Sequence, residues 1–131
     1  MTIPVQVRFA DLDPLNHVNN VAFYTLMETA RIAFFRTIAP ALSGHFVVAR
    51  SECDYVAEIR GGTPSVDVTV SVEKIGRTSF ALLHELRVGA QLVGVGRTVQ
   101  VVLDDDRRPR PLNDQERALL EGDDSTSSSA R

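Results

Sequence analysis

A polar segment near the N-terminus gathers the residue types that acid–base chemistry needs. Residues 11–20 read Asp-Leu-Asp-Pro-Leu-Asn-His-Val-Asn-Asn, with two carboxylates, one histidine and three side-chain amides. A carboxylate can activate water or attack a carbonyl carbon, and N–H groups at a helix N-terminus can stabilise a developing oxyanion. An apolar run precedes the segment and a helical pattern follows it. The sequence therefore predicts a site for developing negative charge, in a loop that feeds a helix N-terminus.

Three roles can be assigned within this segment. Asp13 is the candidate general base or nucleophile, and the sequence leaves both roles open. The backbone N–H groups of Asn20 and Val21, at the expected helix start, are the candidate oxyanion donors. His17 and Asn20 are candidates for orienting a water molecule or the substrate.

The same residues have a structural interpretation. Asp-x-Asp-Pro is a common turn composition, and Asn19 or Asn20 is a plausible N-cap for the following helix. We expect Asp11 to be structural, and we expect one asparagine to cap the helix while the other faces the site.

The elements that position this loop follow from hydrophobic periodicity. Ile3 to Phe9 alternates apolar and polar residues and predicts a first strand. Residues 21–38 carry apolar side chains at helical spacing and predict one long helix, which Pro40 ends. Residues 39–44 form a connector.

Four further strands are predicted over residues 46–59, 66–73, 80–88 and 92–103, with a possible bulge in the first. Asn113 to Leu120 predicts a short helix, with Asn113 as its cap and Glu116 completing a capping box. Residues 122–131 have no large apolar side chain to bury, so we expect a disordered tail.

The predicted fold is α+β: one domain over residues 1–121, in which a curved antiparallel sheet of about five strands wraps around one long helix. Such a sheet has exposed edges and a single long helix to cover it. Because exposed edges favour pairing with another chain, we expect a homodimer or a homotetramer.

The composition excludes several classes of protein. A chain of 131 residues with 44% hydrophobic content and a net charge of -3 suits one globular domain and gives no support for a nucleic-acid partner. No apolar run approaches the roughly 18 residues of a membrane span, and no secretory signal is visible. The single cysteine, Cys53, permits no intrachain disulfide, so we expect a reducing cytoplasm. Cys53 lies in a strand-like run, where a buried, unreactive thiol is the common outcome.

The polar segment and the order of elements resemble the hotdog-fold thioesterases, most closely the 4-hydroxybenzoyl-CoA thioesterase-like acyl-CoA thioesterases. That family carries an Asp-x-Asp-x-x-x-x-Val type loop before its central helix, and its catalytic second aspartate corresponds to Asp13. His17 to Asn20 also resembles the plant fatty acyl-ACP thioesterases, although Leu15 replaces an asparagine of that motif. The resemblance covers about Val5 to Leu103. It implies a hotdog fold and hydrolysis of an acyl-CoA to a free acid and CoA.

The turn from Gly76 to Phe80 resembles the family turn whose basic and hydroxyl residues approach the CoA phosphates. The resemblance makes CoA-binding candidates of Lys74, Arg77, Thr78 and Ser79, with Arg50 as a further candidate on weaker grounds. The alternative interpretation is a solvated hairpin end.

Other interpretations remain open. Glu28 is expected to be structural or to contact another subunit, with Arg31 as an i,i+3 partner. The alternative is a catalytic role, because some hotdog thioesterases use a helix glutamate as the catalytic carboxylate, in a different pattern. We expect no metal and no cofactor, because the spacing of Asp11, Asp13 and His17 matches no closed metal site. A non-catalytic acyl-CoA or small-ligand binding module is an alternative function. An enoyl-CoA hydratase is a weaker one, since His17 stands too close to Asp13 for that motif. The acyl group, and the choice between CoA and acyl carrier protein, cannot be read from the sequence.

Overall fold

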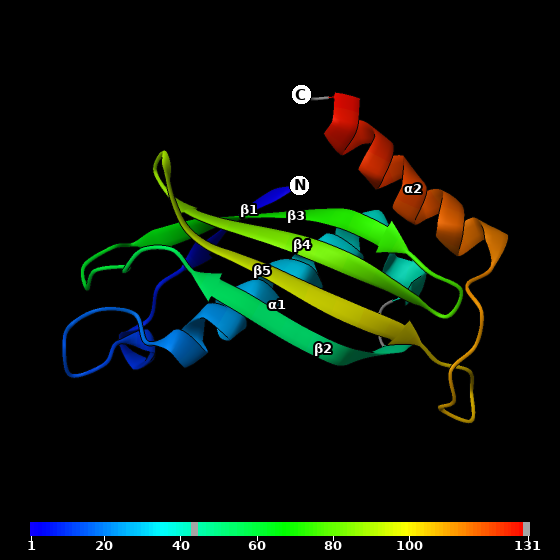
Figure 1. The fold of residues 1–131 in the computed structure, drawn as a ribbon, viewed down its shortest axis with the longest axis horizontal. Coiled ribbons are helices and arrows are strands. Elements are labelled where there is room, and N and C mark those ends of the chain that lie inside the picture. The colour runs from blue at the N-terminus through cyan, green and yellow to red at the C-terminus, as the bar shows by residue number, and fades with distance from the viewer. Residues whose placement is uncertain (43–44, 130–131) are drawn as a thin grey trace.

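The computed structural model describes residues 1–42 and 45–129. Its helices and strands are, in chain order, β1 (Thr2–Gln6), η1 (Phe9–Asp11), α1 (Asn20–Ile38), η2 (Pro40–Leu42), β2 (Phe46–Tyr55), β3 (Ser65–Ile75), β4 (Ser79–Val88), β5 (Gln91–Val102) and α2 (Asp114–Ser129). In this part of the chain the strands form one antiparallel sheet in the order β1-β3-β4-β5-β2. The sheet is curved and α1 lies along one of its faces (Figure 1). The predicted α+β architecture is confirmed.

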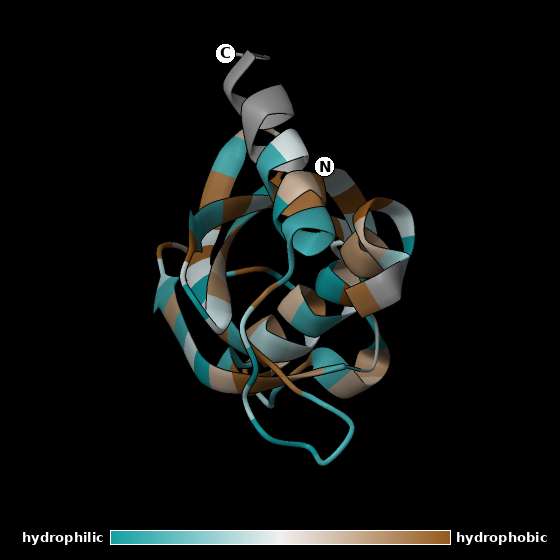
Figure 2. Ribbon diagram, turned by 90° about the vertical axis from the view of Figure 1, so that its right-hand side faces the viewer, coloured by the Kyte–Doolittle hydropathy of each residue, from teal (hydrophilic) through white to brown (hydrophobic). Residues whose placement is uncertain are grey.

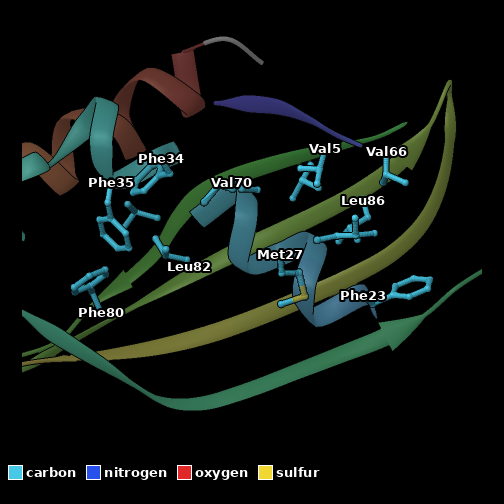
Figure 3. Packing of buried hydrophobic residues seen from close by; sticks show 14 of the residues in the cluster. Val5, Phe23, Met27, Phe34, Phe35, Val66, Val70, Phe80, Leu82 and Leu86 are labelled. Carbon is cyan, nitrogen blue, oxygen red and sulfur yellow. The ribbon is translucent and has the colours of Figure 1, made fainter. Parts of the chain in front are cut away.

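The core lies between α1 and the inner faces of β3, β4 and β5 (Figure 3). Alternate residues of these strands point to α1, and the fully buried large side chains include Phe34, Phe35, Phe80, Leu82 and Leu86. Each such side chain contributes about 1.5–3 kcal/mol on burial. This layer therefore supplies most of the hydrophobic stabilisation.

Two glycines in β5 let α1 approach the sheet closely. A Cβ atom at Gly94 would lie 3.1 Å from the Phe23 ring, and one at Gly96 would overlap the Met27 thioether. Further along α1, the Phe35 ring packs on Phe46 of β2, with ring centroids 4.6 Å apart. Phe23, Met27 and Phe35 share one i,i+4 row of the helix. This row therefore faces β5 and β2, and α1 begins over the Gly94 end of β5.

Two predicted strands end earlier in the structure. β1 stops at Gln6 rather than at Phe9, which begins the 3-10 turn η1 with its side chain 92% exposed. β2 stops at Tyr55 rather than at Ile59, because Val56 and Ala57 both donate to the Val93 carbonyl and the ladder ends there. The irregularity expected in β2 is a bulge between Val48 and Arg50.

The C-terminal helix begins as the sequence predicts but continues further. Asn113 N–H donates to Glu116 Oε1 at 2.9 Å and Glu116 N–H donates to Asn113 Oδ1 at 2.8 Å, which is the predicted capping box. The helical backbone of α2 extends to Ser129, past Leu120, where we expected its end. Residues 43–44 of the predicted connector and residues 130–131 of the predicted tail lie outside the described part. Disorder of the tail in solution stays a prediction.

The loop between β5 and α2 is hydrophilic along most of its length (Figure 2). Arg110 nevertheless ties it to α2, because its guanidinium donates to both carboxylate oxygens of the buried Glu116, each at 2.8 Å. Among the described residues, no helix is long and apolar enough to cross a membrane.

Replacing Glu116 with glutamine should lower the free energy of unfolding by about 2 kcal/mol at pH 7, because Arg110 loses a charged acceptor in a largely buried position. The hydrogen bonds from Arg110 hold the pKa of Glu116 below its ordinary value of 4.5. This stabilisation is present above the ordinary pKa and is lost as the pH falls through the lowered one. Denaturant unfolding against pH should therefore show the gap between wild type and variant closing in acid. The exposed Glu121→Gln change is the control, and a gap that persists in acid contradicts the assignment.

Candidate active-site loop

Asp11 anchors the start of the loop between β1 and α1. Its buried carboxylate accepts the Arg8 backbone N–H at 2.8 Å and the Arg8 guanidinium at 2.7 Å. Burial opposes ionisation of Asp11, but the hydrogen bonds and charge of Arg8 outweigh it and lower the pKa of this carboxyl. Asn19 N–H donates to the Asp11 carbonyl at 2.9 Å, so this residue closes the base of the loop. The contacts agree with the structural role expected for Asp11.

Asp13 and His17 face each other across the loop. Asp13 Oδ2 lies 3.2 Å from His17 Nδ1, and the two side chains are 23% and 30% exposed. The other carboxylate oxygen accepts the Leu15 N–H at 2.9 Å and the His17 N–H at 3.4 Å. The carboxylate is thus oriented by the loop while remaining open to solvent, which is what a base or nucleophile requires.

The segment after β2 is hydrogen-bonded to this loop. Val18 N–H donates to the Ile59 carbonyl at 2.7 Å, and Gly61 N–H donates to the Asn16 carbonyl at 2.8 Å. Asn16 has a φ of 62°, a left-handed conformation that asparagine tolerates, and it lies so close to Gly61 that no side chain would fit there. Sequence analysis did not identify this role of Gly61, because nothing local reveals a partner this distant in the chain.

The start of α1 presents free N–H groups. Asn19 is the N-cap, and its Oδ1 accepts the Ala22 N–H at 2.8 Å. Within the described residues, the N–H groups of Asn20 and Val21 donate to no acceptor. These two groups can therefore receive an oxyanion at the positive end of the helix.

Tyr55 adds a contact at this helix start that the sequence did not indicate. Its hydroxyl donates to the Asn20 carbonyl at 3.1 Å, and its ring meets Phe23 edge-on with centroids 4.9 Å apart. Phe9, Leu15 and Val21 are also 75% or more exposed. Exposed apolar side chains beside a polar loop are typical of a surface that binds a partner or ligand.

The predicted CoA-binding turn lies at the opposite end of the sheet from Asp13 (Figure 1). β1 ends beside Ser65, at the start of β3, and the Asp13 loop follows it there. Lys74 and the turn that leads to Ser79 lie at the other end of β3. The 11 residues of β3 separate the two ends by about 35 Å. Lys74, Gly76 and Ser79 line a hollow of about 270 Å³ at that turn. One protomer therefore does not bring together the two predicted parts of the site.

Four other residues considered from the sequence lie outside the Asp13 loop. Arg50 is exposed in the middle of β2, with its Nη2 3.4 Å from Glu52. Glu28 is exposed on α1 and stands 4.0 Å from Arg31, the partner expected for it. Thr78 and Ser79 are half-buried in the β3–β4 turn.

His84 is a buried histidine that the sequence analysis did not single out. It occupies an inner position of β4 with no exposed surface, and neither ring nitrogen makes a hydrogen bond within the described residues. Burial, followed by the charge of Arg31, lowers the pKa of His84 to about 4, although the Gly96 backbone nearby opposes the shift. The imidazole is therefore neutral at pH 7. In the described part of the chain, no group of three or more His, Cys, Asp or Glu side chains could hold a metal ion.

The chain is similar to known proteins over nearly its whole length. A model of the Thioesterase-like superfamily matches residues 7–120. A thioesterase from Thermus thermophilus, solved in complex with coenzyme A and zinc, is 40% identical, with a TM-score of 0.86 over 95% of this chain and 93% of its own. A predicted thioesterase from Bacillus stearothermophilus is 30% identical, with a TM-score of 0.84 over 93% and 94%. These similarities confirm the hotdog fold.

A shorter match is found to the uncharacterized protein YsmA of Bacillus subtilis (strain 168). It is 28% identical over 81 residues, which are 60% of this chain and 54% of YsmA. The matched segment thus spans about half the length of that relative.

Cys53 should react slowly with alkylating reagents. Burial, together with the charge of Asp54, raises the pKa of its thiol from 9.0 to about 11. At pH 8 the thiolate is then about 100-fold scarcer than in an ordinary cysteine, and its greater basicity recovers only part of that loss. Iodoacetamide should label the folded protein at least about tenfold more slowly than the unfolded one. The labelling rate should rise with pH until about 11. A plateau near pH 9 would contradict this.

Proposed function

The chain belongs to the Thioesterase-like superfamily, and on this basis we propose that it is an acyl-CoA thioesterase that hydrolyses an acyl-CoA to a free acid and CoA. One observation carries the proposal. The Asp13 carboxylate is oriented by Leu15 and His17 but stays partly exposed, in the loop that leads into α1. Such a carboxylate is suited to act on a substrate that approaches from solvent.

Asp13 supplies the base or the nucleophile. As a base, it takes a proton from water while the water oxygen attacks the thioester carbonyl carbon. As a nucleophile, it forms an anhydride with the acyl group, which water then hydrolyses. Either way the carbon–sulfur bond breaks and CoA leaves as a thiolate of low basicity. His17, with Nδ1 3.2 Å from the carboxylate, orients Asp13 or the attacking water.

The start of α1 stabilises the charge that develops on the thioester oxygen. The N–H groups of Asn20 and Val21 make no bond to the protein in the described part, so they can donate to that oxygen without breaking another interaction. The aligned peptide dipoles of α1 favour negative charge at the same point. Donors that are fixed beforehand are worth more than mobile water, because they need no reorganisation during the reaction.

A dimer paired along β2 would complete the site. Phe46, at the start of β2, pairs with Val102 beside the β3–β4 turn, whereas Tyr55, at the end of β2, reaches Asn20 at the start of α1. In an antiparallel pair of β2 strands, the end of one strand meets the beginning of the other. The partner's β3–β4 turn would then approach the Asp13 loop.

The properties of β2 favour this pairing. It is an edge strand of ten residues, exposed along nearly its whole length, and it includes the exposed apolar residues Val47 and Val48. Its first half carries Arg50 and its second half carries Glu52 and Asp54, so an antiparallel copy sets opposite charges against each other. A homodimer along β2, or a homotetramer built from two such dimers, follows from this pairing.

The basic turn suits a carrier that bears phosphate groups. Lys74 and Arg77 are exposed cations, and Thr78 and Ser79 add hydroxyl donors next to them. The relative from Thermus thermophilus binds CoA, which supports the same carrier here. The single cysteine, together with the absence of any possible intrachain disulfide, suits activity in the cytoplasm.

Changing Asp13 to asparagine should lower kcat at least about 100-fold, because the amide can neither take a proton nor attack the carbonyl carbon. The amide oxygen can still accept the Leu15 N–H, so the loop and the melting temperature should be retained. Release of free thiol from short, long and aromatic acyl-CoAs is the measurement, with Asp67→Asn on the exposed side of β3 as the matched control. Turnover near the wild-type rate in Asp13→Asn would contradict the assignment of Asp13 as the base or nucleophile. CoA binding by the wild type without thiol release would favour a binding module.

Mixed dimers test whether the site is shared between subunits. The variants Asp13→Asn and Lys74→Gln/Arg77→Gln should each be weak alone. A heterodimer of the two contains one site with neither defect if the loop and the turn come from different subunits. Coexpression with two different affinity tags, followed by tandem purification, should therefore restore about half of the wild-type activity per dimer. A heterodimer no more active than the mean of its parents places the whole site in one subunit.

A further inference from the structure

The four backbone carbonyls from Gly76 in the β3–β4 turn to Ser79 at the start of β4 all accept hydrogen bonds from the protein. Gly76 accepts a hydrogen bond from Arg117 Nη2 at 2.8 Å, and Arg77 accepts one from Leu112 N–H at 2.9 Å. The Thr78 carbonyl accepts from Val102 N–H at 2.9 Å, and the Ser79 carbonyl accepts from Gly76 N–H at 2.7 Å.

Two N–H groups of the same turn have no protein acceptor in the described part of the chain, whereas that of Gly76 is bound to Ser79. Within the described residues, those of Arg77 and Thr78 donate to no acceptor. In a trans peptide the C=O of one residue and the N–H of the next point in opposite directions. Because the Gly76 and Arg77 carbonyls are held toward the protein, the N–H groups of Arg77 and Thr78 point away from it.

Successive outward N–H groups beside cationic side chains form an anion-binding concavity. The turn itself carries the exposed Arg77, and the exposed Lys74 lies near the end of β3. Neither side chain has an ionic partner in the described part. The arrangement fits a phosphate group, which takes several donors at once and prefers charged ones.

Arg117 comes from α2 and fixes the least constrained peptide of this turn. The peptide between Gly76 and Arg77 follows a glycine, whose backbone rotates more freely than that of any other residue. If that peptide flipped, a carbonyl would replace an N–H at the anion site. The guanidinium holds the Gly76 carbonyl at 2.8 Å and lies 3.5 Å from the Arg77 carbonyl, and so opposes the flip.

The position of Arg117 is itself well determined. Leu120 of α2 has no exposed surface and Leu112 is 5% exposed, so both ends of this segment are packed on the core. The Asn113–Glu116 capping box and the Arg110–Glu116 ion pair secure the first turn of α2. The helix therefore acts as a rigid support behind the turn.

We infer that Arg117 is a positioning residue for the phosphate groups of the acyl carrier: it does not touch the reacting atoms, but it sets the direction of the Arg77 N–H that binds phosphate. The inference rests on the proposed function and deepens it, since it assigns the C-terminal helix a part in carrier binding.

The test compares one acyl group on two carriers. In Arg117→Gln, KM for the acyl-CoA should rise about tenfold with kcat unchanged, because one oriented donor to a charged group is lost. KM for the same acyl group on pantetheine, which has no phosphate, should not change. Arg117→Lys keeps a donor to Gly76 and should recover part of the loss. Arg108→Gln, which removes the same charge from the neighbouring loop, should leave both KM values at the wild-type level.

Titration of the wild type and each variant with CoA alone distinguishes a failure of the role inferred for Arg117 from a failure of the thioesterase proposal. If the wild type binds CoA and Arg117→Gln binds it as tightly, or if KM rises equally for both carriers, the inference is overturned and the thioesterase proposal stands. If the wild type binds CoA but releases no thiol from any acyl-CoA, hydrolysis is overturned, and weaker CoA binding by Arg117→Gln still supports the inference. If the wild type neither binds CoA nor hydrolyses any acyl-CoA, both are overturned.

Discussion

The contact between α1 and β5 determines where chemistry can occur in this fold. Gly94 and Gly96 leave room for the side chains of Phe23 and Met27, so the first turns of α1 lie over the Gly94 end of β5. This packing places the N-terminus of α1 at the end of the sheet where β1 finishes (Figure 1). The connection from β1 to α1 must lie at the same end. The position of the Asp13 loop beside free helical N–H groups is thus a consequence of helix packing.

The same row of α1 continues into a polar layer. One turn after Met27 comes Arg31, whose side chain is 11% exposed and whose charge reaches His84 in β4. On β5, which neighbours β4, Gln100 Nε2 donates to Thr98 Oγ1. His84, Thr98 and Gln100 are all buried. Buried polar groups are costly without partners. A shift of α1 by one turn would move the guanidinium among apolar side chains, so this layer helps to select one register of the helix on the sheet.

The sequence allowed prediction of what depends on local pattern. The alternation in β3, the i,i+4 row of α1 and the capping box at Asn113 and Glu116 are short-range signals, and the structure contains them all. The predicted ends of β1 and β2 were wrong, because hydrogen bonds to distant residues determine where these strands end. In β2, for example, two successive N–H groups donate to the Val93 carbonyl. The contact between Asp13 and His17 was not predicted, although both residues lie within one loop. The support from Gly61, Tyr55 and Arg117 was not predicted either, since each contact joins residues far apart in the chain.

The separation of loop and turn is the physical reason for proposing a dimer. Within one protomer the two ends of β3 are about 35 Å apart along the strand direction. Under the proposed pairing, the path from β2 to the partner's β4 crosses only the partner's β2 and β5. At about 4.8 Å per strand, that path is about 15 Å. Antiparallel pairing thus replaces a distance along strands with a shorter distance across them. A carrier held by its phosphates at one subunit's turn can then present its thioester to the other subunit's Asp13.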